Sequence, residues 1–233
     1  DTYLSIQEAL THAGVETGTN PEITWIDSEL IEKNPELLKT VNCFITPGGF
    51  GERGIEGKIR AIQYARENKI PYLGLCYGMQ LMVIEYARNV VGLKEANTTE
   101  INPDSKYLVV DLMPEQKEKI KNSQYGATMR LGEYPCEIKD GTLAHQAYNK
   151  NSIDERHRHR YEVNPEYIKQ IEKAGLVFSG QSPDGKLMEI AELPVEKHPF
   201  MLGSQFHPEF TSSPLNPNPL FHSLIKVAIE NKK

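Results

Sequence analysis

The sequence predicts an α/β fold with three layers, in which an open, mostly parallel sheet carries helices on both faces and continues into an antiparallel extension. Short β-rich runs alternate with helical patterns over residues 42–92, and this alternation is typical of parallel sheets. The run PYLGLC is apolar throughout, as expected of a strand covered on both faces. After residue 97, shorter strands separated by turn residues indicate the antiparallel extension.

The first part of the chain supplies the parallel layer. In TYLSIQEALTHAG the apolar residues Leu4, Ile6 and Leu10 recur at near-helical intervals, and Gly14 ends the pattern. NCFITP is a β-rich run that breaks at Gly48. The expected elements are, in order, a helix at 2–14, strands at 22–27 and 42–47, a helix at 55–69, a strand at 71–76 and a helix at 78–92.

The second part of the chain supplies the extension. Residues 118–126 are polar enough to form a mobile loop, and PLNPNP at 214–219 is expected to be a proline-rich turn. The expected strands are 107–112, 128–132, 136–139, 159–163, 176–181, 187–193 and 200–206, and the expected helices are 165–175 and 220–232.

Length and composition favour one domain over residues 1–233. A chain of 233 residues with 39% apolar residues is long enough for one sizeable core and short for two. The formal net charge of -6 argues against a nucleic-acid partner, because phosphate binding needs clustered Lys and Arg. The cysteines number 3 and lack the CxxC spacing of zinc or redox sites, which argues against a disulfide framework.

The ends of the chain and its apolar runs bear on location. No run approaches the ~18 apolar residues of a membrane span, and no basic-then-apolar leader opens the chain. We therefore expect a cytoplasmic protein with no membrane partner. A parallel sheet normally begins with a strand, whereas this chain begins with a helical pattern, so we expect it to be cut from something longer.

Cys76 lies where the PYLGLC strand meets the following helix. A sharp strand-to-helix turn presents a side chain above the sheet edge, and the positive end of the helix dipole favours a thiolate there. Gly74 and Gly78 relieve crowding around such a turn, as in the G-x-S-x-G elbow of hydrolases with sulfur in place of oxygen. The competing interpretation is a buried structural cysteine, so a catalytic role needs a base.

QFHPEF supplies that base. His207 and Glu209 follow the predicted strand at 200–206, at the carboxyl edge where open α/β sheets keep their sites. Two residues apart in extended chain, their side chains project together, so that the carboxylate orients the imidazole for proton transfer. A lone histidine is usually structural. Its combination with an elbow cysteine predicts a Cys76, His207 and Glu209 triad.

The motifs PGGFG, GLCYGMQ and FHPEF together resemble a class I glutamine amidotransferase domain, whose fold is flavodoxin-like. NTTE, GATMRLG, ERHRHRYEVN and FHPEFTSSP resemble the glutaminase domain of CTP synthase, and this resemblance runs nearly end to end. Tyr77 departs from that pattern, which more often has Leu or Phe, and GLCYGMQ is also similar to GMP synthetase. The RHRHRYEVN signature, however, is absent from GMP synthetase.

The resemblance implies a mechanism and a set of site residues. The Cys76 thiolate would attack the side-chain amide carbon of L-glutamine, His207 would protonate the departing ammonia, and water would hydrolyse the thioester. Backbone N–H groups of the Gly48 and Gly49 turn and of Tyr77 would bind the oxyanion, although an isolated PGG is usually an ordinary tight turn. The substrate-binding residues expected are Gly48, Gly49, Tyr77, Gly78, Met79, Gln80, Glu100 and Arg160.

Free glutamine is a zwitterion, so a site that excludes water needs an anion for its ammonium and a cation for its carboxylate. By motif matching, Glu100 and Arg160 resemble the family's glutamine-binding acid and arginine. A surface charge is the competing interpretation of each. In an extended RHRHR segment, the arginines at 156, 158 and 160 share one face and His157 and His159 the other. A metal site at the two histidines lacks further ligands, so we expect no metal.

The resemblance also implies partners and effectors. No phosphate loop occurs in the sequence, so we expect no cofactor in this domain, and ATP and Mg only for a synthetase domain, normally in the same chain, that uses the ammonia. We expect the full-length enzyme to be an oligomer. FGERG, with Phe50 and Arg53, resembles the segment linked to stimulation by GTP. Three alternatives stay open: the glutaminase domain of GMP synthetase, a stand-alone cysteine hydrolase or peptidase, and a catalytically silent regulatory module.

Overall fold

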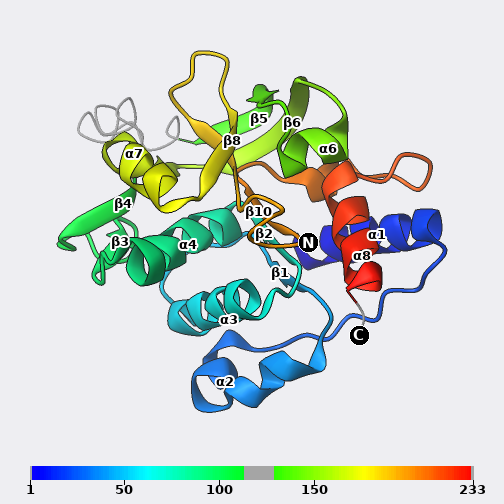
Figure 1. The fold of residues 1–233 in the computed structure, drawn as a ribbon, viewed down its shortest axis with the longest axis horizontal. Helices are drawn as coiled ribbons and strands as arrows, with labels where there is room; N and C mark the ends of the chain where they lie inside the picture. The colour runs from blue at the N-terminus through cyan, green and yellow to red at the C-terminus, as the bar shows by residue number, and fades with distance from the viewer. Residues whose placement is uncertain (1, 113–128, 232–233) are drawn as a thin grey trace.

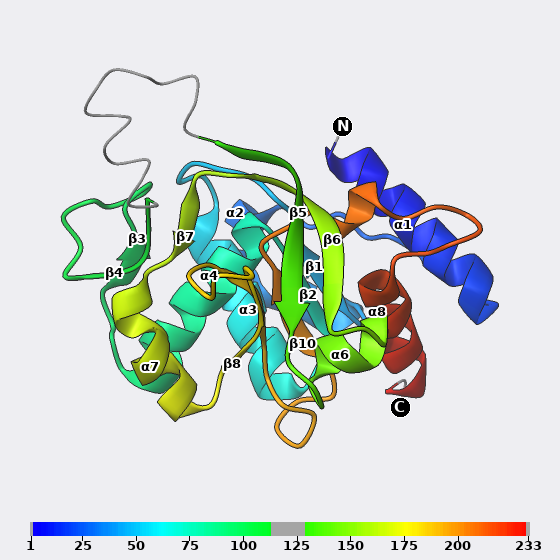
Figure 2. The same cartoon turned by 90° about the horizontal axis from the view of Figure 1, so that it is seen from above.

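The structure, a computed structural model, describes residues 2–112 and 129–231, so the loop predicted at 118–126 lies outside the described residues. A seven-stranded sheet runs through the molecule, with helices on both faces (Figures 1 and 2). The strand order is β1-β2-β10-β9-β8-β5-β6. The bounds are Phe44–Thr46 (β1), Tyr72–Leu75 (β2), Met201–Ser204 (β10), Met188–Glu192 (β9), Val177–Gln181 (β8), Arg130–Ile138 (β5) and Ser152–His159 (β6).

The central sheet is mixed. β1 pairs with β2, and β2 with β10, in parallel, whereas the neighbours from β10 to β6 pair antiparallel. The predicted α/β fold with an antiparallel extension is confirmed. Among the described strands of this sheet, four pairings are antiparallel and two are parallel, so the antiparallel extension is larger than predicted. The segments expected as two short strands at 128–132 and 136–139 form one strand, β5, which pairs with β6 along nearly its whole length.

A second, three-stranded sheet stands beside the first. Its order is β3 (Ala96–Thr98), β4 (Tyr107–Leu112) and β7 (Tyr161–Val163). The strand predicted at 159–163 is therefore split: β6 ends in the central sheet and β7 begins in the small one, with Arg160 between them. The chain from β6 to β7 ties the two sheets together.

Helices form the two outer layers. One layer, with α2, α3, α4 and α7, shares an apolar cluster in which Ile62, Tyr72 and Leu81 are fully buried. The other, with α1, α6 and α8, packs around Leu73 and Phe221. The bounds are Thr2–Thr17 (α1), Ser28–Lys33 (α2), Ile55–Asn68 (α3), Tyr77–Tyr86 (α4), Leu143–Tyr148 (α6), Pro165–Ala174 (α7) and Pro219–Glu230 (α8), with shorter helical turns at Pro35–Thr40 (η1), Ala87–Val91 (η2) and Pro208–Phe210 (η4).

Helix α4 lies unusually close to β2 and β10. A Cβ atom on Gly203 would lie 2.8 Å from Cβ of Met79, and one on Gly74 would lie 2.7 Å from the carbonyl carbon of Gly78. Side chains at either strand position would push the helix away. Each strand thus offers glycine to α4 and a larger apolar side chain, such as Leu73, to the opposite layer.

The strand predicted at 22–27 is wrong, because the segment is irregular. A strand needs a neighbour for its backbone groups, and this segment pairs with no described strand. Its Trp25 is 55% exposed and meets Tyr3 of α1 edge to face, with ring centroids 5.2 Å apart. The segment therefore contacts α1 through Trp25 and joins no described sheet.

The helix predicted to end at Gly14 runs on to Thr17. Gly14 lies inside it because Pro21 packs there, and a Cβ atom on Gly14 would come within 2.5 Å of the proline ring. The short elements α2, α6 and β3 were not predicted, since each is too brief to show a period.

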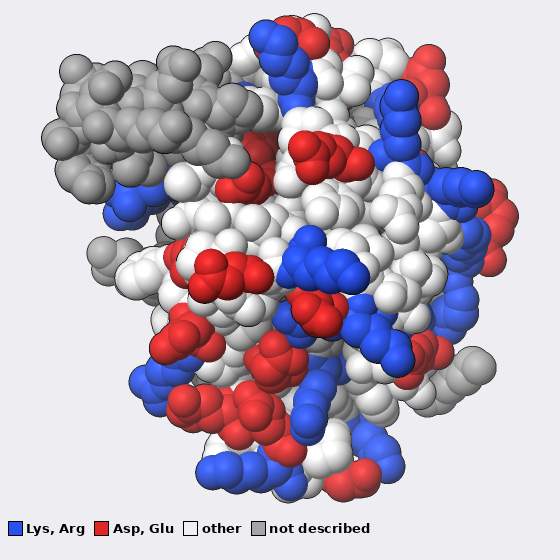
Figure 3. Space-filling model, turned by 90° about the vertical axis from the view of Figure 1, so that its left-hand side faces the viewer, with Lys and Arg blue, Asp and Glu red and all other residues white. Residues whose placement is uncertain are grey.

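The described residues contain no helix long and apolar enough to cross a bilayer. Cys43, Cys76 and Cys136 are free, and Cys76 and Cys136 are buried. Lys and Arg side chains are interspersed with Asp and Glu over the face in Figure 3, without a continuous basic surface there.

Candidate active site

The carboxyl ends of β1, β2 and β10 meet at one edge of the central sheet, because these three neighbours are parallel. Gly48 follows β1, Cys76 follows β2 and His207 follows β10. The backbone N–H of Cys76 donates to the carbonyl of Ser204 over 2.7 Å, and that of His207 donates to the carbonyl of Arg156 over 2.8 Å. Backbone pairing therefore fixes both segments that carry the predicted nucleophile and base.

Cys76 occupies a strained turn between β2 and α4. Its φ and ψ are 50° and -98°, in a region that costs a residue with a side chain about 1–3 kcal/mol. The amides of Met79 and Gln80 both donate to its carbonyl, which begins the helix directly after it. A Cβ atom on Gly78 would lie 2.2 Å from the carbonyl oxygen of Thr46, so only glycine lets the turn close.

His207 and Glu209 stand beside the cysteine. Nδ1 of His207 lies 2.7 Å from Oε1 of Glu209, whose side chain is fully buried. Phe210 stacks on the imidazole, with ring centroids 5.2 Å apart and planes at 20°. Held by a carboxylate and a ring, the imidazole keeps one orientation. The structure thus brings Cys76, His207 and Glu209 together.

The electrostatics of His207 follow from these contacts. Burial by itself lowers the pKa of an imidazole, but hydrogen bonds to Cys76 and to Glu209, together with their charges, raise the pKa of His207 from 6.5 to about 10. The arrangement therefore favours an imidazolium next to the sulfur at neutral pH. That form can give a proton to a leaving group.

The glycine turn after β1 lies against the imidazole. A Cβ atom on Gly48 would come within 2.8 Å of Cε1 of His207 and 3.7 Å of Cβ of Cys76. A Cβ atom on Gly49 would lie 3.7 Å from Cδ1 of the Tyr77 ring. Because the Tyr77 amide opens α4, it has no acceptor within its own helix. The turn and this amide thus lie beside the sulfur, where an oxyanion would form.

Glu100 and Arg160 both influence the pKa of Tyr161. Glu100 accepts a hydrogen bond from the Gly51 amide at 2.9 Å, and the Tyr77 hydroxyl donates to the Gly51 carbonyl at 2.7 Å. Burial and then Glu100 raise the pKa of Tyr161, whereas Arg160 lowers it. Both charges therefore lie within electrostatic reach of Tyr161. Arg160 itself is exposed, and Glu100 is half-buried.

The remaining predicted residues take varied positions. Met79 is fully buried against β10, and Gln80 is 3% exposed, with its amide nitrogen bonded inside the protein. Phe50 is 87% exposed in the loop after β1. Arg53 forms an exposed ion pair with Glu29 of α2 at 2.9 Å. In the described part of the chain, the side chains of these four form no hydrogen bond with a side chain of the triad.

The sulfur of Cys76 has two further neighbours that the sequence did not reveal. Nε2 of Gln205 donates to it over 3.6 Å, and the thiol lies 3.7 Å from the carbonyl oxygen of Arg158. Gln205 is fully buried at the end of β10. Its place directly before FHPEF was the available signal, but an apolar strand end gave no reason to expect an inward glutamine.

The RHRHR segment divides as predicted. His157 and His159 are buried, whereas Arg156, Arg158 and Arg160 are exposed. The buried side joins a charge cluster in which Nε2 of His157 lies 2.7 Å from Oε2 of Glu189.

Arg130 pairs with the other oxygen of Glu189, and His159 lies 3.0 Å from Glu162. Burial raises the pKa of Glu162 and lowers that of His159. No group of three or more His, Cys, Asp or Glu that could hold a metal lies within residues 2–112 and 129–231.

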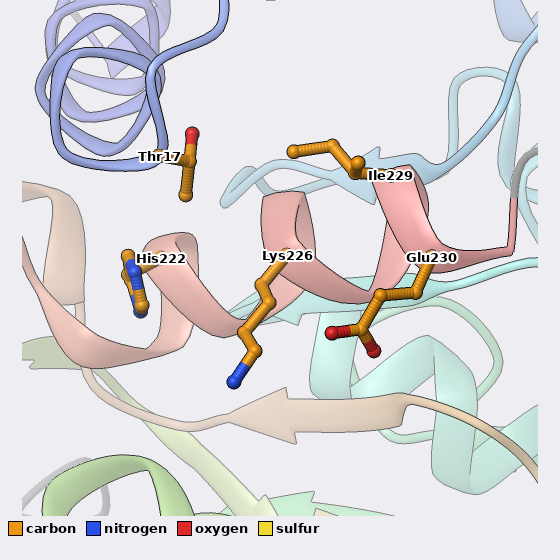
Figure 4. Close-up of a pocket in the computed structure, with 5 residues that line it drawn as sticks. All are labelled: Thr17, His222, Lys226, Ile229 and Glu230. Atoms are coloured by element: carbon orange, nitrogen blue, oxygen red, sulfur yellow. The ribbon is translucent and has the colours of Figure 1, made fainter.

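A separate depression lies between α1 and α8, and no residue of the triad lines it (Figure 4). It is lined by Thr17, His222, Lys226, Ile229 and Glu230. It offers no thiol and no strained backbone. The sheet edge is therefore the candidate active site.

Comparisons with known proteins point to one family. The family described as "Glutamine amidotransferase class-I" matches residues 1–227. CTP synthase of Carboxydothermus hydrogenoformans is 56% identical over 100% of this chain and 43% of its own length. CTP synthase of Dehalococcoides mccartyi is 57% identical over 98% of this chain and 41% of its own length. The chain therefore spans less than half the length of these curated relatives.

Solved structures agree. The glutaminase domain of Trypanosoma brucei CTP synthase with bound acivicin matches with a TM-score of 0.91 and 36% identity, over 100% of this chain and 90% of that chain. A GMP synthase subunit of Thermoplasma acidophilum matches with a TM-score of 0.58 and 13% identity, over 99% of this chain and 89% of that chain. The second likeness shows the fold alone.

The raised pKa of His207 gives a direct test of the Cys76 contact. In Cys76→Ala the hydrogen bond and the negative charge of the sulfur are lost, so we expect the pKa of His207 to fall from about 10. The imidazole titration is measured by NMR, with Cys43→Ala as the control. An unchanged pKa in Cys76→Ala would show that the sulfur does not set the protonation of His207.

The same shift has a consequence for stability. Because the folded pKa of about 10 lies above the ordinary 6.5, protonated His207 stabilises the folded chain fully below pH 6.5. This contribution is lost as the pH rises towards 10, and Cys76→Ala should narrow that window.

Proposed function

Because the chain belongs to the class-I glutamine amidotransferase family, we propose that it hydrolyses the side-chain amide of L-glutamine and passes on the ammonia. The observation that carries this proposal is the convergence of Cys76, His207 and Glu209 at the carboxyl edge of the sheet, with the cysteine at positive φ. A merely structural cysteine needs neither a strained turn nor an oriented imidazole.

In the first half of the proposed reaction, the Cys76 thiolate attacks the amide carbon and forms a C–S bond. The carbonyl oxygen becomes an oxyanion, which amides of the Gly48 and Gly49 turn and of Tyr77 stabilise. The His207 imidazolium gives its proton to the amide nitrogen, the C–N bond breaks, and ammonia leaves a glutamyl thioester. Glu209 holds the imidazole in place throughout.

In the second half, neutral His207 takes a proton from water, and the hydroxide attacks the thioester. The C–S bond breaks, glutamate leaves, and the thiolate and imidazolium are restored. His207 gives one proton to the departing ammonia and takes one from water, so it ends the cycle as the imidazolium that began it. The pKa of about 10 supports a resting ion pair at neutral pH.

Glu100 and Arg160 are proposed to bind the charged end of glutamine. Glu100 would accept from the α-ammonium and Arg160 would grip the α-carboxylate. Their opposite effects on Tyr161 support a site flanked by both signs. Gly78, Met79 and Gln80 are buried in α4. We therefore propose that they form the wall of the glutamine pocket by fixing the position of this helix.

The ammonia is proposed to serve a synthetase domain in a longer protein. The curated relatives are CTP synthases of which this chain spans 43% and 41%, which supports amination of UTP to CTP in the part of the protein outside this chain. ATP and Mg would be bound by that part. The likeness to a GMP synthase subunit is one of fold alone and gives that alternative no support. A cytoplasmic location and an oligomeric full-length enzyme stay predictions.

The nucleophile is tested by substitution in the full-length protein. Cys76→Ala should abolish glutamate release from glutamine, because no other thiol lies at the edge, while the unfolding transition stays cooperative. Cys43→Ala is the matched control and should keep its activity. Undiminished glutamate production in Cys76→Ala would exclude the proposed mechanism, and turnover of peptides or esters without preference for glutamine would favour a general hydrolase.

Substrate recognition is tested at Arg160. Arg160→Ala should raise KM for glutamine by roughly 10- to 100-fold, the loss expected when a carboxylate loses a charged partner. Its rate of Cys76 alkylation by iodoacetamide should not change, since that reagent is neutral. Arg156→Ala, on the same exposed side, is the control. Equal losses in both assays would mean that the fold, not recognition, had been damaged.

We also propose that GTP acts on the loop after β1. Phe50, at 87% exposed, offers a ring for stacking, and Arg53 offers a cation to phosphate. Phe50→Ala in the full-length protein should reduce stimulation of glutamine hydrolysis by GTP and leave the rate without GTP unchanged. Trp25→Ala, another exposed aromatic, is the control. Full stimulation in Phe50→Ala would remove this residue from the effector site.

A further inference from the structure

Gln205 contacts the reacting sulfur but has no part in the mechanism described above. It follows β10 directly, is fully buried, and places Nε2 at 3.6 Å from Sγ of Cys76. A buried amide of this kind is retained only where its hydrogen bonds are made. Its position between β10 and His207 makes it part of the same backbone segment as the general base.

A chain of hydrogen bonds fixes which end of the Gln205 amide meets the sulfur. Nε2 of Gln80 donates to the carbonyl oxygen of Tyr161 over 3.0 Å and to Oε1 of Gln205 over 3.1 Å. A carbonyl oxygen only accepts, so the Gln80 amide must turn its nitrogen to Tyr161. The same nitrogen then faces the oxygen of Gln205, which leaves the N–H group of Gln205 for Cys76.

We propose that Gln205 is a permanent hydrogen-bond donor to the Cys76 thiolate, oriented by Gln80 and the carbonyl of Tyr161. The inference rests on the proposed glutamine hydrolysis for its role in turnover. Cys76 is 5% exposed, so water does little to solvate the charge of its sulfur. The opposite neighbour, the carbonyl of Arg158, accepts from a thiol and gives a thiolate nothing.

A permanent donor stabilises the thiolate at stages of the reaction when His207 carries no positive charge. His207 gives its proton to ammonia and later takes one from water, so its own charge changes during the cycle. The sulfur needs a donor that does not change with it, above all when the C–S bond breaks and the thiolate departs. Gln205 neither gains nor loses a proton in this range, and its N–H group faces the sulfur in both halves of the reaction.

Other ionisable groups near the sulfur come from three elements. His207 faces it from the segment after β10, and the charge of Cys76 contributes to the raised pKa of Glu162 on β7, after burial and Glu189. Tyr77 on α4 is held neutral, because burial and then Glu100 raise its pKa. Variants at Gln205 leave all of these groups in place. A change in the reactivity of the sulfur relative to the wild type can therefore be assigned to Gln205.

The test measures alkylation of Cys76 by iodoacetamide in the full-length protein, followed on its peptide by mass spectrometry between pH 5 and 10. Gln205→Met removes the donor and keeps the volume. Gln205→Glu keeps the shape and the oxygen that faces Gln80 but turns an anion to the sulfur. Ser204→Ala is the control, since Ser204 directly precedes Gln205, is equally buried, and its side chain donates only to the Phe206 carbonyl among the contacts described.

We expect Gln205→Met to slow alkylation at pH 7 by about tenfold, the loss expected when a charged group loses one hydrogen bond. The pH of half-maximal rate should rise by about one unit, and the rate at high pH should stay within about twofold. Gln205→Glu should be slower still, by about 100-fold, because like charges repel. Ser204→Ala should match the wild type, and kcat for glutamine should fall in both Gln205 variants with little change in KM.

The inference would be overturned if Gln205→Met were alkylated at the wild-type rate. It would also be overturned if Gln205→Glu reacted faster than Gln205→Met, because a merely structural role predicts that the isosteric Glu variant changes the alkylation rate least. An equal shift in Ser204→Ala would do the same. If Gln205→Met does not fold, Gln205→Glu decides, and loss of folding in both would assign Gln205 to the core.

Failure of the proposed function gives a different result. Alkylation needs no glutamine, so the expected order of rates without any glutamine hydrolysis would uphold the donor and reject the glutaminase.

Discussion

Parallel pairing of β1, β2 and β10 is the constraint on which the rest of the structure depends. Three consecutive parallel neighbours bring three carboxyl ends to one edge, and each end carries one part of the site: the glycine turn, the cysteine and the histidine. Residues far apart in the chain thereby meet at one edge of the sheet. The backbone bond from Cys76 to Ser204 joins two of these ends directly.

The second constraint is space between the sheet and α4. Glycine at 74 and 203 lets the helix approach, and glycine at 78 lets its first turn pass the carbonyl of Thr46. These contacts hold Cys76 at a φ of 50° that an unsupported cysteine would avoid. Close packing of an apolar helix thus stabilises a strained residue at the point where chemistry requires it.

The convergence of the proposed catalytic residues could be predicted because they lie in short continuous motifs. The turn at Cys76, with its two glycines, is recognisable from its own motif, and so is the pair His207 and Glu209 after a predicted strand. Neither motif needs the other to be recognised. The strand predicted at 22–27 is wrong because the β-rich run finds no described strand to pair with, and only the tertiary structure shows that its Trp25 contacts Tyr3 of α1. Gln205 was missed likewise, since nothing local distinguishes an inward from an outward amide at a strand end.

The stretch from β6 to β7 shows how the two sheets and the site are coupled. Its exposed arginines and buried histidines alternate, and the buried side is held by Glu189 and Glu162. Two carbonyl groups of the same stretch then reach inward, that of Arg158 to the sulfur and that of Tyr161 to Gln80. The charge cluster therefore holds a backbone whose carbonyl groups contact the thiol of Cys76 and the amide of Gln80. A change at Glu162 would therefore reach Cys76 by two routes, through this backbone and through the interaction between the charges of Glu162 and Cys76.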